Sequence, residues 1–180
     1  MFGLARLLDH GILSGMKLET PYKDIQFRSI SPADRPILLE IYASSRQNEM
    51  DLLQDWTAQQ KLDFLTQQFD AQHTHYQQHY SDGFFQLILK DLRPIGRLYW
   101  IQYSGEIRII DIALLPDFQS QGIGTTLLAS IQKLAADNDK KVSIHVEFFN
   151  PALRLYERLG FQKVEEHGIY HFMIWNAEVK

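Results

Sequence analysis

The stretch ALLPDFQSQGIGTTLLASIQ, residues 113–132, passes from an apolar segment through a polar turn into a second apolar segment. The turn carries two glycines, two glutamines and a serine, and it holds no lysine. The apolar spacing after Gly124 predicts a helix, so the unit is strand, turn and helix. A helix N-terminus offers unpaired N–H groups and a partial positive charge, and glycine lets a ligand approach the backbone closely. The turn is therefore either a plain connection or a site for an anionic group such as a diphosphate.

Two familiar phosphate-binding patterns do not fit this turn. A P-loop requires a lysine after its second glycine, and Thr125 occupies that position. The dinucleotide fingerprint requires a third glycine where Leu127 stands, and it follows a parallel strand, whereas the strands predicted here are antiparallel. The sequence excludes the first pattern and disfavours the second.

The composition limits the class of protein. The chain has 180 residues, of which 45% are hydrophobic, so it fits one domain with a sizeable core. A formal net charge of −4 argues against a nucleic-acid partner, which would require a basic patch. The absence of cysteine excludes disulfides, Cys-bound zinc and a Cys nucleophile.

The N-terminal segment differs from the rest. Residues 1–15 are apolar but are interrupted by Arg6, Asp9 and His10, whereas a secretory segment has an unbroken apolar run. No window approaches the roughly 20 apolar residues of a membrane span. We expect a cytoplasmic protein without a membrane partner. Residues 1–20 are expected to lie outside the fold, as an appended helix, a tail or an upstream start before Met16, and residues 21–180 to form the domain.

The order of predicted elements is β-α-α-β-β-β-α-β-α-β-β, which indicates an α+β fold with a mixed sheet and helices. Three closely spaced β segments between residues 84 and 115 predict an antiparallel meander. A hairpin is predicted around Gly168, although the last strand could instead pair between subunits. The predicted strands are 25–30, 84–90, 95–103, 106–115, 141–149, 161–166 and 170–177, and the predicted helices are 31–46, one long or two shorter helices within 51–80, 123–134 and 150–160.

Two sequence motifs occur in order, separated by the predicted helix and strand. The first is Gln119-Ser120-Gln121-Gly122-Ile123-Gly124, and the second is the segment NPALRLYERLGF, residues 150–161. Together they resemble the Q/R-x-x-G-x-G/A and N-x-x-A-x-x-x-Y-x-x-x-G-F patterns of the GNAT superfamily of N-acetyltransferases. The resemblance covers about residues 25–175 and is strongest over 106–161.

This resemblance implies a fold and a cosubstrate. The fold is a mixed, mostly antiparallel sheet of six to seven strands, split by a cofactor cleft and covered by helices on both faces. The glycine turn would bind the pyrophosphate of acetyl-CoA, the pantetheine arm would lie in the split, and no metal is needed. The Leu114 N–H would donate to the oxyanion of the tetrahedral intermediate. The implied cofactor contacts are Ile112, Ala113, Leu114, Gln119, Ser120, Gln121, Gly122, Ile123, Gly124, Thr125, Asn150, Ala152 and Tyr156.

Taken by itself, the second motif also predicts a capped helix. Asn150 is placed as the N-cap, Pro151 at the first helical position and Gly160 just beyond the end. By periodicity Tyr156 is a core aromatic. By the resemblance it is instead the acid that protonates the departing thiolate, and a phenol with a pKa of about 10 suits a thiolate near 8.5.

Transfer to an amine requires a base, and charged residues inside strands are candidates because strands are depleted in them. Asp111 stands in an apolar strand, and His145 and Glu147 lie two residues apart on one face of another. These three either surround the amine or belong to structural hydrogen-bond networks.

The resemblance implies that the helices after the first strand shape the acceptor site. His75 and His79 are four residues apart, as are Tyr76 and Tyr80, so a helix would display both pairs. The group is a helix face, a lining of the acceptor cleft or, without a third ligand, an incomplete metal site. Arg46 either pairs with a substrate carboxylate or is a surface charge.

The function predicted from these observations is acetyl transfer from acetyl-CoA to a primary amine, most simply of a small molecule, by direct attack. The alternatives are a non-catalytic acyl-CoA sensor, a protein N-acetyltransferase and a nucleotide-binding domain of another kind. The chain is expected to act as a monomer or homodimer.

Overall fold

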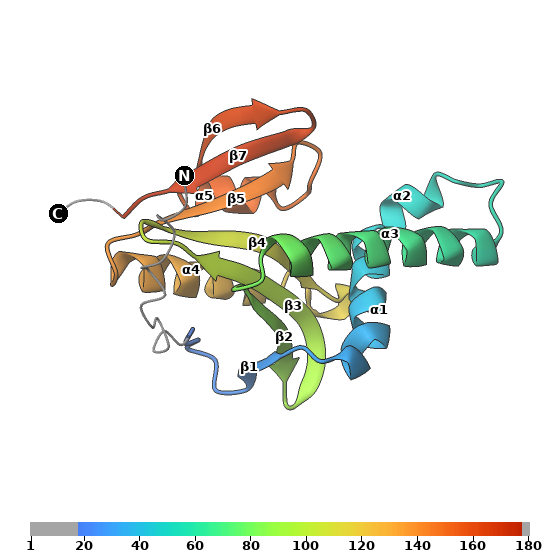
Figure 1. Cartoon of the computed structure of the whole chain (residues 1–180), viewed down its shortest axis with the longest axis horizontal. Coiled ribbons are helices and arrows are strands. Elements are labelled where there is room, and N and C mark those ends of the chain that lie inside the picture. Colours follow the sequence, from blue (N-terminus) through green and yellow to red (C-terminus); the bar gives the residue numbers. More distant parts are fainter. Residues whose placement is uncertain (1–17, 178–180) are drawn as a thin grey trace, which may run out of the picture.

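The computed structural model describes residues 18–177, in which seven strands form one sheet. Figure 1 shows the sheet with helices on both sides, and the order across it is β1-β2-β3-β4-β5-β7-β6. Of the neighbouring pairs only β4 and β5 run parallel. The strands are β1 (Ile25–Ser29), β2 (Phe84–Lys90), β3 (Arg93–Gln102), β4 (Glu106–Leu114), β5 (Lys141–Glu147), β6 (Gln162–His167) and β7 (Tyr170–Trp175). The helices are α1 (Arg35–Ser45), α2 (Gln47–Asp51), α3 (Ala58–His79), α4 (Ile123–Ala136) and α5 (Leu153–Arg158), and short 3-10 turns cover Pro32–Asp34 and Pro116–Phe118.

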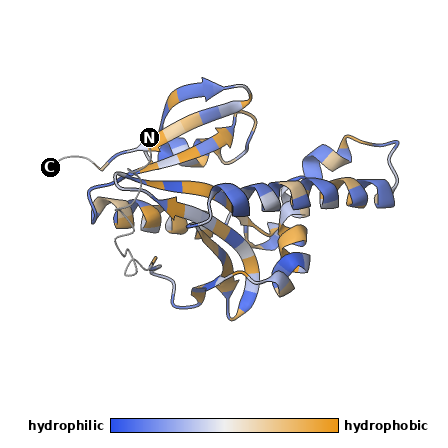
Figure 2. Cartoon of the chain, in the orientation of Figure 1, coloured by the Kyte–Doolittle hydropathy of each residue, from blue (hydrophilic) through white to orange (hydrophobic). Residues whose placement is uncertain are grey.

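The sheet separates two hydrophobic cores. One lies under α4 and α5, where Leu127, Ile131 and Tyr156 pack against the inner sides of the strands. The other lies under α1 and α3, where Ile41, Phe69 and Tyr99 are fully buried. Figure 2 shows the hydrophobic residues concentrated in the central strands and α4, whereas the outer half of α3 is mostly hydrophilic. The predicted mixed α+β fold with helices on both faces is confirmed.

The meander is also confirmed, because β2, β3 and β4 pair antiparallel in sequence order. The hairpin at Gly168 is present, and β7 is hydrogen-bonded to both β5 and β6. Both edges of β7 are thus occupied within the chain, which decides against its pairing between subunits. The alternatives for residues 1–15 lie outside the described residues.

The helical region 51–80 resolves into the short α2, which begins before it, and the long α3. Thr57 caps α3 by accepting a hydrogen bond from Gln60 N at 3.2 Å. The periodicity identifies Leu65 and Phe69 as buried, but Leu62 is 48% exposed. Leu62 lies in the outer half of α3, where the helix extends beyond the sheet (Figure 1), so no partner covers it. None of the helices within residues 18–177 has the length and apolarity to cross a lipid bilayer.

Candidate active site

The sheet opens between β4 and β5. These strands pair only over Glu106–Ile109 and Lys141–Ile144. Beyond that point β4 follows β3 to Leu114, and β5 follows β7 to Glu147. A bulge places Ile110 as an extra residue between the pairs Trp100–Ile109 and Tyr99–Asp111, and it lies where the strands part. The predicted split of the sheet is present at this position.

The edge of β4 that faces the split carries free backbone donors. Leu115 N donates to Ile95 O at 2.8 Å, so the backbone groups of Leu115 face β3. Because backbone groups alternate in direction along an antiparallel strand, those of Ile112 and Leu114 face the split. Those of Ala113 face β3, so its predicted backbone contact with a ligand in the split does not agree with the geometry.

The turn after β4 presents a row of amides. Gly122 has φ +82°, the left-handed conformation that glycine adopts at little cost, and it caps α4. The first backbone hydrogen bond of the helix runs from Thr126 N to Gly122 O at 3.0 Å. The four preceding amides, of residues 122–125, therefore have no intrahelical acceptor and lie at the positive end of the helix dipole.

The two glutamines of the turn bind backbone carbonyls. Gln119 Nε2 donates to Leu114 O at 2.8 Å, and Gln121 Nε2 donates to Asp117 O at 2.6 Å. These bonds satisfy acceptors in the turn and leave its donors available. Tyr22, which the motifs do not include, lies beside the turn, with its hydroxyl 3.5 Å from Thr126 Oγ1. Tyr22 and Thr126 are 104 residues apart in the sequence, so no pattern of neighbouring residues predicts this contact.

The second motif forms the short helix α5, with its start displaced from the prediction. Asn150 Oδ1 accepts from Ala152 N at 2.8 Å, but Pro151 and Ala152 form a turn and the helix begins at Leu153. Asn150 therefore caps that turn rather than the helix itself. Gly160 has φ +84° and follows the C-cap as predicted, and Phe161 N returns to Tyr156 O at 3.0 Å.

Tyr156 is buried, with 4% of its surface exposed, and packs edge-on against Phe161. Burial raises the pKa of the Tyr156 phenol above its usual range, and the nearby Asp111 carboxylate adds to this increase. The phenol is therefore protonated at neutral pH. Tyr156 is the core aromatic that its periodicity predicts, and its protonated phenol lies within electrostatic reach of Asp111.

Asp111 forms an ion pair with a residue that the motifs did not single out. Arg97 is 3% exposed, and its Nη2 lies 2.5 Å from Asp111 Oδ2, without the alignment of a hydrogen bond. Arg97 also donates to Gln72 Oε1 of α3 at 3.0 Å, and its guanidinium lies over the Tyr99 ring. The signal was present in the sequence, since Arg97 interrupts the apolar strand β3 as Asp111 interrupts β4.

His145 and Glu147 face the α1 side of the sheet, on the same face as Asp111. The His145 ring stacks on Phe172 at 4.7 Å. Although His145 is exposed, partial desolvation by its neighbours, helped by the charge of Arg108, lowers the pKa of its imidazole. Glu147 is only 14% exposed at its side chain and forms an ion pair with Arg46 at 3.2 Å. The two residues share a face, as the two-residue spacing predicts.

The structure places Tyr76 against the sheet but leaves the other predicted acceptor residues of α3, His75 and His79, exposed. Tyr76 turns towards the sheet and packs edge-on against Tyr99. Burial raises the pKa of Tyr76, and Asp111 adds to this. His75 and His79 are exposed and stack on each other at 3.9 Å, so they do not accompany Tyr76 to the cleft. Arg46 is not an isolated surface charge, because it is paired with Glu49 and Glu147.

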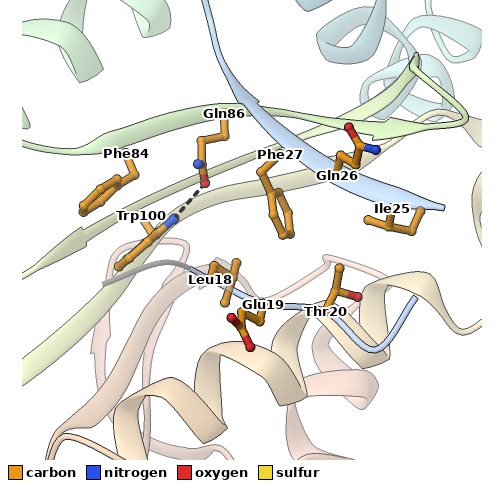
Figure 3. Close-up of a pocket in the computed structure, with 9 residues that line it drawn as sticks. All are labelled: Leu18, Glu19, Thr20, Ile25, Gln26, Phe27, Phe84, Gln86 and Trp100. Carbon is orange, nitrogen blue, oxygen red and sulfur yellow. Dashed lines mark hydrogen bonds between the residues drawn. The ribbon is translucent and has the colours of Figure 1, made fainter. Parts of the chain in front are cut away.

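A separate hollow lies away from the split. It has a volume of about 440 Å³ and lies between residues 18–20 and strands β1–β3, where Phe84 stacks on Trp100 (Figure 3). None of its lining residues belongs to the split between β4 and β5, so this hollow is not part of the candidate site. Within residues 18–177, no three acidic or histidine side chains are grouped as a metal ion would require.

The sheet is opened between two parallel strands, and the turn beside the opening presents unpaired amides, an arrangement that offers hydrogen-bond donors to an elongated anionic ligand. The Acetyltransferase (GNAT) family matches residues 50–161, more than half of the chain. The chain belongs to this family, which is a family of acyltransferases, and the resemblance seen in the two motifs is confirmed.

Individual relatives match over short segments. The chain is 38% identical over 68 residues to a mycothiol acetyltransferase of Corynebacterium aurimucosum, which covers 37% of this chain and 22% of the relative. It is 40% identical over 60 residues to an N-alpha-acetyltransferase of Saccharolobus solfataricus, which covers 32% of this chain and 36% of the relative. The chain thus matches only about a fifth to a third of the length of these relatives.

Solved structures share the fold. The PaiA N-acetyltransferase of Thermoplasma acidophilum, in complex with coenzyme A, has a TM-score of 0.64 at 18% identity and covers 85% of this chain and 99% of its own. A spermidine N-acetyltransferase of Vibrio cholerae, in complex with coenzyme A and spermine, has a TM-score of 0.56 at 20% identity and covers 86% of this chain and 96% of its own. At these identities the likeness concerns the fold alone.

Proposed function

We propose that the protein transfers an acetyl group from acetyl-CoA to the primary amine of a small molecule. The observation that carries this proposal is the unpaired edge of β4, at Ile112 and Leu114, next to the four free amides at the start of α4. An extended arm with a diphosphate at one end matches both features. The names of the relatives, which are acetyltransferases, and the coenzyme A in the solved structures support the same ligand.

In this proposal each part of the cosubstrate has its own partner. The amides of residues 122–125 and the helix dipole hold the pyrophosphate. The backbone of Ile112 and Leu114 replaces the missing strand pairing with hydrogen bonds to the arm. The Leu114 carbonyl already accepts from Gln119, so the Leu114 N–H is the free group that stabilises the developing oxyanion.

The reaction proceeds by direct attack. The neutral amine forms a bond to the acetyl carbonyl carbon, the carbon–sulfur bond breaks, and the sulfur takes the phenol proton of Tyr156. The N–H proton that the new amide loses then returns through solvent to the phenolate. Asp111, His145 and Glu147 lie on the acceptor side and orient the amine or accept its first proton through water.

A small acceptor is favoured by the position of α3. Its inner half covers the acceptor side, because Gln72 binds Arg97 and Tyr76 packs on Tyr99. This helix restricts the space above Asp111.

Thiol release from acetyl-CoA, measured across a panel of primary amines, tests the function. We expect amine-dependent release and acetylated product in wild type, and a loss of turnover in Tyr156→Phe with coenzyme A binding retained. Binding without turnover on any amine, together with unchanged behaviour of Tyr156→Phe, would instead identify a sensor. A larger thermal shift with NAD than with coenzyme A would indicate a different nucleotide ligand.

A further inference from the structure

At the open end of the split, an ion pair joins the two halves of the sheet. Arg46 lies at the junction of α1 and α2, and Glu147 ends β5, 101 residues later. Arg46 Nη1 lies 3.2 Å from Glu147 Oε2. Since α1 packs on β3 and β4, whereas β5 belongs to the other half, the pair spans the open end of the split on the acceptor side.

The pair lies in a partly dry, aromatic setting. Its side chains are 24% and 14% exposed, and the Arg46 guanidinium lies 5.8 Å from the centre of the Tyr42 ring. Tyr170, which begins β7, donates its hydroxyl to Glu147 Oε1 at 3.4 Å. Arg46 also contacts Glu49 at 2.8 Å. The Arg46–Glu147 contacts of 3.2 to 3.5 Å are longer than well-formed charge-assisted hydrogen bonds, so each group retains capacity for a better partner.

This pair is connected to Asp111 through Tyr42. The Tyr42 ring centre lies 5.8 Å from the guanidinium carbon of Arg46 and 5.8 Å from that of Arg97. Arg97 in turn forms the ion pair with Asp111, the candidate base on β4. The charged groups from Arg46 to Asp111 therefore lie along the same α1 side of the sheet.

We propose that Arg46 and Glu147 recognise an acceptor that carries a primary ammonium and a carboxylate close together, that is, a free α-amino acid or a close analogue. This inference rests on the proposed function and specifies its substrate class. The acceptor carboxylate binds the planar guanidinium of Arg46 in bidentate fashion, and the ammonium binds Glu147.

The charge balance favours such an acceptor over the alternatives. A zwitterion replaces the Arg46–Glu147 pair by two new pairs, and Arg46 keeps its contact with Glu49. An amine without a carboxylate would take Glu147 from Arg46, bring a second positive charge beside it and leave the guanidinium with Glu49 as its carboxylate partner. Acetylation removes the positive charge of the amine, so the product loses its attraction to Glu147 and is released.

The test compares acceptors that differ in one charge. Initial rates of thiol release are measured with the standard amino acids, with their C-terminal amides and with a short peptide whose C-terminus is amidated. In wild type, kcat/KM for the best amino acid is expected to exceed that of its amide at least tenfold. Arg46→Gln is expected to reduce this ratio to about one without changing the KM of acetyl-CoA, and Arg46→Lys is expected to retain part of it.

Arg35→Gln is the matched control. Arg35 lies at the other end of α1 and pairs with Asp70 of α3 at 2.8 Å, away from the split, so the acid-to-amide ratio should stay at its wild-type value. Melting curves establish that each variant is folded. Equal rates with acid and amide in wild type, faster acetylation of the amidated peptide, or a ratio that survives Arg46→Gln would each overturn the inference. Acetylation of such amines with loss in Tyr156→Phe would leave the proposed function intact, whereas no turnover on any amine would contradict the function itself.

Discussion

At the scale of single residues, the turn before α4 depends on the φ of +82° at Gly122. A side chain at this position would have room, since the nearest atom to an added Cβ is the Tyr22 hydroxyl oxygen at 3.7 Å. The obstacles to substitution are therefore the backbone conformation and, for an acidic residue, the charge. Asn and Asp both tolerate the left-handed region better than other residues, so a comparison of the two isolates the charge.

We expect Gly122→Asp to weaken coenzyme A binding at least tenfold more than Gly122→Asn does. Both variants bear the same backbone strain, but only the aspartate places a negative charge beside the amides proposed to hold the pyrophosphate. A tenfold difference corresponds to about 1.4 kcal/mol. Calorimetric titration with coenzyme A measures both affinities. Equal binding by the two variants would place the pyrophosphate elsewhere.

Tyr156 gives a prediction about pH. Because its role requires a protonated phenol, and burial raises its pKa above the ordinary value of about 10, ionisation of this group should not lower kcat at any pH up to about 10. Because the pKa of Tyr156 is raised, any loss of activity caused by its ionisation occurs at a higher pH than it would for an ordinary tyrosine. Tyr156→Phe should reduce kcat by roughly 10² to 10⁴ with little change in the KM of acetyl-CoA. A kcat profile of wild type between pH 7 and 10, with circular dichroism to verify folding, would contradict this role if activity halved near pH 8.5.

Residue-level interpretation of the sequence singles out residues that depart from their surroundings. Asp111 and Glu147 were named as candidate bases because strands are depleted in charged residues, and both lie on the α1 side of the sheet. Their role as bases stays a prediction. The same argument applies to Arg97, whose pairing with Asp111 depends on the register of β3 and β4. Register is a property of two strands, so the sequence of either one alone did not indicate the pair.

At the scale of elements, β3 holds β4 in place through Gly96. This glycine pairs with Leu114, and a Cβ built on it would collide with the Ala113 carbonyl oxygen and lie 3.1 Å from the Leu114 Cα. Only glycine allows this close approach of the two backbones. The end of β4 thus turns its other edge, with the Leu114 N–H, towards the split.

We expect Gly96→Ala to destabilise the protein by about 1–3 kcal/mol, the usual range for overpacking, and to lower kcat by displacing the Leu114 amide. Gly105→Ala is the control, since Gly105 precedes the other end of β4 and an added Cβ meets nothing within 4 Å. Urea denaturation and steady-state kinetics measure the two effects. If Gly96→Ala were as stable and active as Gly105→Ala, the close packing at Leu114 would not matter for the site.

Element boundaries were predictable where local chemistry sets them. The bounds of β2 follow from an apolar run, and the end of α5 just before Gly160 follows from the positive φ of that glycine. The predicted start of α5 was wrong because the Asn150 side chain accepts from the Ala152 amide within a turn that precedes the helix. An asparagine side chain caps a turn and a helix in the same way, so the sequence does not distinguish the two. The exposure of Leu62 was missed because periodicity predicts a face of a helix but not how far the helix extends beyond the sheet.

At the scale of the whole molecule, the split is the feature that the sequence of β4 and β5 does not contain. Both strands continue past the point where they part, and β5 keeps its pairing with β7 to Glu147. The separation arises from the three-dimensional path of β4, which has the bulge at Ile110 and continues along β3. Only the likeness of the two motifs to a known family predicted it.

Hydrogen exchange resolved by NMR tests this open edge directly. In the free protein the amides of Ile112 and Leu114 should exchange much faster than that of Leu115, which is hydrogen-bonded to Ile95 O. Coenzyme A at 100 times its Kd stabilises the whole fold by about 2.7 kcal/mol, so amides that exchange by global unfolding slow by a common factor of about 100. Ile112 and Leu114 should gain additional protection, because they change from solvent-bonded to ligand-bonded groups. Strong protection of these two amides in the free protein would show that β4 is paired on both edges in solution, and then neither the arm nor the oxyanion could bind there.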